Sequence, residues 1–178
     1  MAHDWRPEIL TLVRIHRAIA EADSAGLGEH HLPRVAASAP VVAGLEEGLG
    51  VLLDPDYREL LGYADGWPSF WQSVDLFGVD DLAGGPRMSL ARDLLAATEP
   101  LVLAQAGLAG TDLLPVAATT VDLDLFVMPV REGRQVPPVV WLAGREIDRF
   151  DTFGEFFLAM IEYNRRELAP LRSPGPPA

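Results

Sequence analysis

The chain opens with apolar residues at helical spacing. Steps of four, three, four and three residues separate them, so the segment 5–22 is predicted to form an amphipathic helix. A second helix is predicted over 39–49, because Ser38 can cap it and Gly50 can end it. We interpret both helices mainly as scaffold. The residues that set the first spacing are Trp5, Ile9, Leu12, His16 and Ile19.

The segment 54–66 carries the clearest local signal in the chain. Asp54 can cap a helix whose first position is Pro55, and the apolar residues that follow form one stripe. Gly66 is predicted to adopt the left-handed conformation that stops this helix. A short strand is predicted next, over 73–78.

The pattern changes from helical to alternating near residue 113. A helical turn is predicted over 79–85, and the segment 89–107 is predicted to be a helix interrupted near Pro100. Alternation then predicts half-buried antiparallel strands over 113–120 and 121–130. The second of these strands is predicted to turn one face to the core and an aspartate face to solvent. The two sets are Val121, Leu123, Leu125 and Val127, and Asp122 and Asp124.

The last third of the chain predicts a hairpin and a helix. The segment 137–150 reads as two strands joined by a turn at Ala143–Gly144. The segment 152–168 opens with a Thr-x-x-Glu capping box and continues as an amphipathic helix, which Pro170 is predicted to end.

These elements predict an α+β fold with N-terminal helices, a central, mainly antiparallel sheet and a C-terminal amphipathic helix. A length of 178 residues, 49% of them hydrophobic, fits one domain with a sizeable core. We expect a single domain over 1–172 and a disordered, Pro-rich tail over 173–178.

Charge narrows the classes of partner. The net charge is -12, which disfavours direct contact with nucleic acid. The excess is uneven, because the segment 54–81 holds seven acidic residues and one arginine. No apolar run reaches the roughly 20 residues that span a bilayer, and residues 1–10 lack the features of a signal peptide, so we expect a cytoplasmic protein without membrane contact.

Candidate chemistry is sparse. The pairs Asp80–Asp81 and Asp122–Asp124 could share a hard cation, but no loop has metal-ligand periodicity, and a solvated acidic face is the favoured interpretation. The doublet His30–His31 lacks an identifiable third ligand for zinc and is interpreted as a surface feature. There is no cysteine, no Gly-x-Ser-x-Gly elbow and no glycine-rich nucleotide motif. We therefore expect no catalytic centre, cofactor or metal.

Three stretches carry a family resemblance: "LGVLLDPDYRELLGYADGW" (49–67), "VDLFGVDDL" (74–82) and "VVWLAGREIDRFDTFGEFFLAMI" (139–161). Their order resembles the SUKH superfamily, also called the SMI1/KNR4 family, over about 38–168, and leaves 1–37 as an N-terminal helical extension. The resemblance implies a mixed α+β domain without a known catalytic centre. Many bacterial members are similar to immunity proteins that neutralise toxins, often nucleases, and eukaryotic relatives resemble intracellular adaptors.

The expected partner-binding surface lies in the segment 65–81. Trp67 is assigned to the core, and of the adjacent pair Phe70 and Trp71 one is expected to be exposed, Trp71 being favoured. Acidic residues around these anchors would speed encounter with a basic partner. The expected partner-binding residues are Asp65, Phe70, Trp71, Asp75, Asp80 and Asp81.

Three functions follow from this interpretation. The leading one is a non-enzymatic, SUKH-like immunity protein of bacterial or phage origin that binds and inhibits a basic toxin domain, with a nuclease as the best fit. The alternative is a regulatory or assembly adaptor of the host or a phage, without a toxin partner. The least favoured is a hydrolase that uses the aspartate pairs. The sequence leaves the oligomeric state open.

Overall fold

Seven strands form one antiparallel sheet in the part of the chain that the computed structural model describes, residues 3–23, 26, 28 and 30–172. The strands lie in the order β1-β2-β3-β4-β6-β7, and β5 pairs with the end of β4. The predicted α+β class is confirmed. The strands are β1 (Trp67–Trp71), β2 (Val74–Leu76), β3 (Asp112–Thr119), β4 (Leu125–Arg131), β5 (Arg134–Gln135), β6 (Val139–Leu142) and β7 (Glu146–Phe150).

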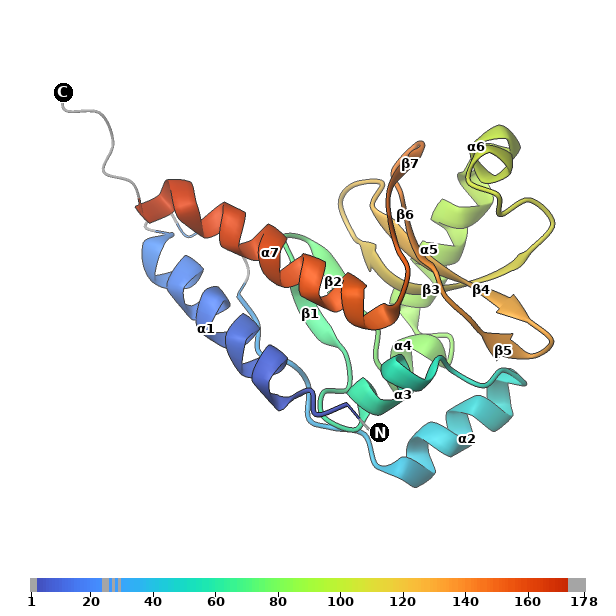
Figure 1. The fold of residues 1–178 in the computed structure, drawn as a ribbon, viewed down its shortest axis with the longest axis horizontal. Helices are drawn as coiled ribbons and strands as arrows, with labels where there is room; N and C mark the ends of the chain where they lie inside the picture. Colours follow the sequence, from blue (N-terminus) through green and yellow to red (C-terminus); the bar gives the residue numbers. More distant parts are fainter. Residues whose placement is uncertain (1–2, 24–25, 27, 29, 173–178) are drawn as a thin grey trace.

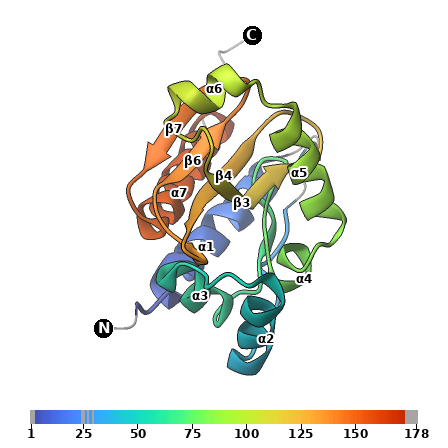
Figure 2. The ribbon, with the colours of Figure 1, turned by 90° about the vertical axis from the view of Figure 1, so that its right-hand side faces the viewer.

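Helices cover both faces of this sheet. α7 crosses one face with α1 beside it, α5 lies against the other face, and α2 and α3 close one end (Figures 1 and 2). None of the described helices combines the length and apolar character that crossing a bilayer requires. The helices are α1 (Arg6–Ala22), α2 (Ala39–Leu49), α3 (Pro55–Leu61), α4 (Val79–Leu82), α5 (Pro86–Ala97), α6 (Pro100–Gln105) and α7 (Phe153–Arg172).

The first and last helices run parallel along their length. The Trp5 ring, just before α1, lies 5.2 Å from Phe157 near the start of α7, and further along both helices Ile15 and Leu168 line one groove. Before α1, the His3 N–H donates to a carboxylate oxygen of Glu59 in α3 at 2.7 Å. The segment predicted as an N-terminal extension therefore supplies part of the common core.

β4 departs from the predicted alternation. It begins at Leu125 rather than at residue 121, because the Thr119 hydroxyl accepts the N–H groups of Val121 and Asp122 and turns the chain out of the sheet. The predicted placement of Val121 and Leu123 in the core is wrong, since both are exposed. The β4 residues from Leu125 to Pro129 are all buried, because helices cover both faces of the sheet there.

The segment 54–66 shows one confirmed cap and one correction. The Asp54 carboxylate caps α3 by accepting the N–H groups of Asp56 and Tyr57 at 3.0 and 3.3 Å. The helix ends at Leu61, so Gly66 does not stop it. Gly66 does have a left-handed φ of +76°, and a Cβ there would lie 2.5 Å from the Gly78 nitrogen. Its role is to let two backbone segments approach closely.

The remaining helix boundaries were predicted in part. The helix expected over 89–107 begins three residues earlier, at Pro86, and is divided before Pro100 as expected. Pro170 lies inside α7, which continues to Arg172, so the prediction that it ends the helix is wrong. The tail 173–178 lies outside the described residues.

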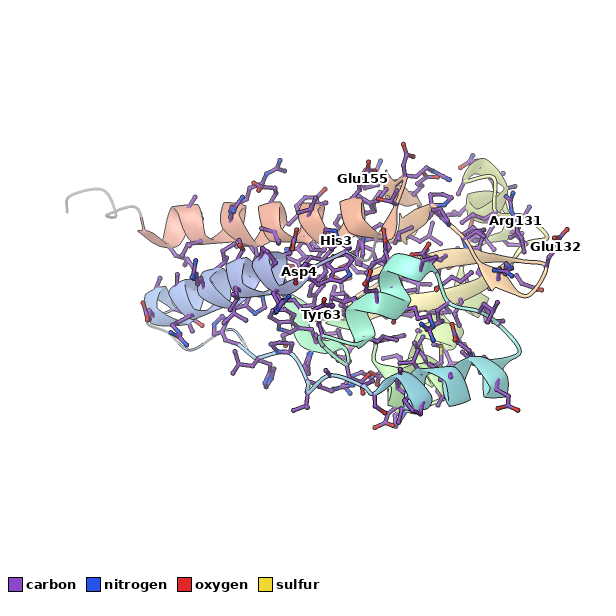
Figure 3. All side chains as sticks on the ribbon, turned by 60° about the horizontal axis from the view of Figure 1, so that its bottom comes forward. His3, Asp4, Tyr63, Arg131, Glu132 and Glu155 are labelled. Atoms are coloured by element: carbon purple, nitrogen blue, oxygen red, sulfur yellow. The ribbon has the colours of Figure 1, made fainter. Side chains whose placement is uncertain are left out.

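Tight turns join the outer strands, and of these the turn at Ala143–Gly144 was predicted from the sequence. Gly144 has a φ of +68° in the turn between β6 and β7. Between β4 and β5, Glu132 and Gly133 have φ values of +52° and +70°, the conformation of a two-residue hairpin turn. Figure 3 shows Arg131 and Glu132 extending from this hairpin, at the opposite end of the molecule from the last turns of α7.

Candidate functional site

A cavity of about 660 Å³ lies where α1, the segment after it, the β1–β2 hairpin, the start of α5 and α7 meet. Its size is in the range of small-ligand sites. Its lining residues come from the first, middle and last parts of the chain. Polar side chains in its lining include His16, Asp23, Gln72, Asp75, Arg87 and Glu167.

An irregular hairpin forms one wall of the cavity. Trp67 pairs with Leu76 and Trp71 pairs with Val74. Between these two pairs, β1 therefore advances by four residues and β2 by only two. The extra residues bulge, and Ser69 has a φ of +48°. The Ser69 N–H donates to the Asp75 carboxylate at 2.7 Å, which satisfies the backbone group that the bulge removes from the ladder.

This bulge corrects the expected alternation of Phe70 and Trp71. Phe70 is fully buried, with its ring 5.2 Å from Phe157, and so cannot contact a partner in this conformation. Trp71 is half-buried rather than exposed, and packs 5.1 Å from Trp141. Trp67 lies in the core as predicted. Adjacent residues point to opposite faces only in a regular strand, and β1 is not regular.

Two of the four aspartates expected to bind a partner are buried. Asp75 is 7% exposed and Asp81 is 3% exposed. Arg87 donates through Nε to Asp75, and Arg34 donates through Nη1 to Asp81 at 2.7 Å. Both arginines lie outside the segment 54–81, so a charge count confined to that segment misses their neutralising effect. The prediction that Asp75 and Asp81 are accessible to a partner is wrong.

Asp65 and Asp80 have different positions. The Asp65 carboxylate accepts the Val79 N–H at 2.6 Å and so holds the start of α4. Asp80 is exposed on the same short helix. Of the six expected partner-binding residues, only Asp80 is exposed, and the six do not form one open patch.

His16 lies in the wall of the cavity and is 5% exposed. Its Nε2 lies 3.2 Å from the Phe70 carbonyl oxygen, which also accepts a hydrogen bond from Asn164 Nδ2 at 3.1 Å. Burial lowers the pKa of His16, outweighing the nearby backbone carbonyls of His31 and Phe70, which raise it. The folded protein therefore favours the neutral ring.

Glu167 projects from α7 into the same cavity. Burial raises the pKa of its carboxyl, and the neighbouring side chains of Gln72 and Trp71 partly offset this effect. Gln72 is held at the tip of the hairpin with a φ of +51°, a conformation in which side chains are uncommon. The side-chain contact between Gln72 and Glu167 links the hairpin to α7.

Potential metal ligands do not come together in the described part of the chain. The described residues contain no group of three or more histidine, aspartate or glutamate side chains able to hold a metal ion. The Asp124 carboxylate accepts from Trp141 Nε1 at 2.7 Å, whereas Asp122 is exposed in the loop, so the two do not act as a pair. Both His30 and His31 line the cavity, and His30 Nε2 lies 3.4 Å from a carboxylate oxygen of Asp23.

Two comparisons of the sequence with known proteins found no match. No protein-family model matches the chain, and no curated protein is significantly similar to it. The resemblance to the SUKH superfamily therefore stays a proposal that rests on the residues quoted for it.

The cavity was not predicted from the sequence, although the sequence contains one sign of it. Asn164 follows Phe157 and Met160 at helical spacing, so a polar residue falls on the buried stripe of α7. His16 occupies the equivalent position in the stripe of α1. A buried polar residue in an apolar stripe needs a hydrogen-bond partner, and this need is the signal that could have indicated a polar site between the two helices.

Proposed function

We propose that this protein is a non-enzymatic, cytoplasmic binding protein that neutralises a basic protein partner, with a toxin domain as the leading candidate. The proposal draws on the resemblance to the SUKH superfamily and on the distribution of charge. A nuclease domain fits the partner best, because its substrate groove must itself be basic.

The charge distribution is the observation that supports this proposal most. Among the described residues, four carboxylates are buried, and three arginines pair with three of them. This group has a net charge of -1, so -11 of the chain's net charge of -12 comes from other residues. An acidic exterior attracts basic proteins over several ångströms and repels nucleic acid. The seven residues are Glu46, Asp54, Asp75, Asp81, Arg34, Arg58 and Arg87.

The second candidate is an adaptor of the host or a phage without a toxin partner. The same acidic exterior and the same sparse catalytic chemistry support it. The two candidates differ in the partner and in the consequence of binding, and not in the chemistry of the surface.

Two experiments separate them. Affinity purification from the native host, followed by mass spectrometry, identifies the partner, and a small basic effector domain is the expected result. Co-expression with that domain is then expected to restore growth of cells that the domain kills. Recovery of housekeeping proteins alone, with no rescue, would favour the adaptor. An association rate that does not change with ionic strength would contradict an electrostatic encounter.

A further inference from the structure

The cavity has an excess of carboxylates over guanidinium groups. Asp23, Asp75 and Glu167 line it, and Arg87 is the one arginine among the described residues that does so. Arg87 already bonds Asp75 and lies 3.5 Å from Asp81, so its charge is committed to the protein. Leaving the histidines aside, the lining carries two net negative charges. A phosphate or a carboxylate ligand is therefore disfavoured, and a cation is favoured.

Glu167 is the carboxylate that lacks a countercharge. Asp75 pairs with Arg87 and Asp23 lies beside His30, whereas Glu167 makes no ion pair in the described part of the chain. Its partner at the hairpin, Gln72, is neutral. Half-burying a carboxylate without a cation costs free energy, and a cation in the cavity would reverse that cost.

His16 adds a hydrogen-bond acceptor to the same wall. The Phe70 carbonyl can only accept, so the neighbouring Nε2 carries the proton in the neutral ring. Nδ1 is then an acceptor, and it has no hydrogen-bond partner among the residues that the structure describes. Protein atoms enclose this nitrogen, so Glu167 is the acceptor in the lining that a ligand rich in N–H donors would reach.

Apolar side chains continue the lining beyond these polar groups. Val121 is 79% exposed and Leu171 is 46% exposed, and both line the cavity. They come from the loop after β3 and from the last turn of α7. An alkyl chain attached to a cationic group would cover this apolar surface, as the stems of lysine and arginine do.

We propose that the cavity binds an alkylammonium or alkylguanidinium group, with the charged end against Glu167 and the alkyl chain against Val121 and Leu171. The inference rests on the cavity alone and does not depend on the proposed partner. The charged group can belong to a free small amine or to a lysine or arginine side chain of a protein.

Isothermal titration of the full chain at low ionic strength tests this proposal with three probes. Agmatine represents a free ligand, a blocked arginine tripeptide represents a protein side chain, and the same tripeptide with citrulline replaces the guanidinium by a neutral group of the same shape. Saturable binding of agmatine, of the arginine tripeptide or of both is expected, and which of them binds identifies the source. Binding of the citrulline tripeptide is expected to be at least tenfold weaker.

Glu167→Gln is the deciding variant, because glutamine keeps the shape and the contact with Gln72 but removes the charge. It should weaken binding tenfold or more. Glu162→Gln is the matched control on the same helix, since Glu162 is exposed and does not line the cavity; it should leave binding unchanged. Circular dichroism confirms that both variants fold. No saturable binding, equal binding of the citrulline probe, or wild-type affinity in Glu167→Gln would overturn the proposal.

Discussion

Arg34 donates a hydrogen bond to Asp81 at 2.7 Å, although 47 positions separate the two residues. Arg34 lies in the segment before α2, where the Arg34 N–H also donates to the Gly66 carbonyl at 3.0 Å. Asp81 accepts a second hydrogen bond from the Gly78 N–H at 3.1 Å. One ion pair thus ties the segment before α2 to the corner that leads from β2 into α4.

Asp81→Ala is expected to destabilise the protein by about 3 kcal/mol, because removing one partner of a buried ion pair leaves the other uncompensated. Asp80→Ala is the control, since the neighbouring carboxylate is exposed, and its effect should stay within about 0.5 kcal/mol. Urea denaturation measures both. Equal stability of the two variants would contradict the structural role.

Gly66→Val is expected to destabilise the protein because the residue has a positive φ and its Cβ would meet the Gly78 nitrogen at 2.5 Å. Gly44→Ala in α2 is a matched substitution without either problem, since nothing lies within 4 Å of the added Cβ. It should stabilise by about 0.5 to 1 kcal/mol through helix propensity. Thermal melts that show the same sign of change for both variants would refute this account of Gly66.

Stability is expected to fall as the pH falls through about 6.5, the ordinary pKa of histidine. Burial lowers the pKa of His16 in the folded state. As the pH falls, the unfolded chain therefore binds a proton at His16 before the folded protein does, and this protonation stabilises the unfolded chain. The raised pKa values of Asp54 and Glu167 act in the opposite direction, because those groups bind protons more readily when folded.

His16→Gln isolates the histidine contribution. The measurement is the change in the free energy of unfolding between about pH 7.5 and about pH 5.5, compared between the variant and the parent. The variant should lose less stability over this range, whatever its stability at the upper pH. An identical change in both proteins would show that His16 titrates normally.

Divalent metals are expected to leave the melting temperature unchanged, because the described residues form no group of three suitable ligands. Melts with increasing Mg²⁺, Ca²⁺ and Zn²⁺ check this expectation. A rise of several degrees that depends on concentration would demonstrate a metal site.

Local signals predicted the elements that depend on neighbouring residues. The Asp54 cap, the left-handed Gly50 after α2 and the turn at Gly144 each follow from a few adjacent positions. These features also place the ends of α2, the start of α3 and the β6–β7 turn correctly, because capping and turn chemistry act within about four residues.

The features that escaped prediction depend on residues distant in sequence. The bulge in β1 is held by Asp75 across the hairpin, and the acidic segment is neutralised by Arg34 and Arg87 from outside it. Val121 continues an alternating pattern that Thr119 interrupts through its side chain. The composition of a segment does not show which side chains from other parts of the chain form hydrogen bonds or ion pairs with it.

The parallel pairing of α1 with α7 has a consequence for synthesis of the protein. Trp5 packs against Phe153 and Phe157, so its burial joins residues about 150 positions apart. During synthesis α1 leaves the ribosome before α7, and the apolar stripe of α1 stays without its α7 contacts until residues 153–172 have also emerged. During that interval Trp5, Leu12 and Ile19 are available to chaperones or to other nascent chains. Chains that terminate before residue 153 keep this surface uncovered permanently, which makes them natural substrates for degradation.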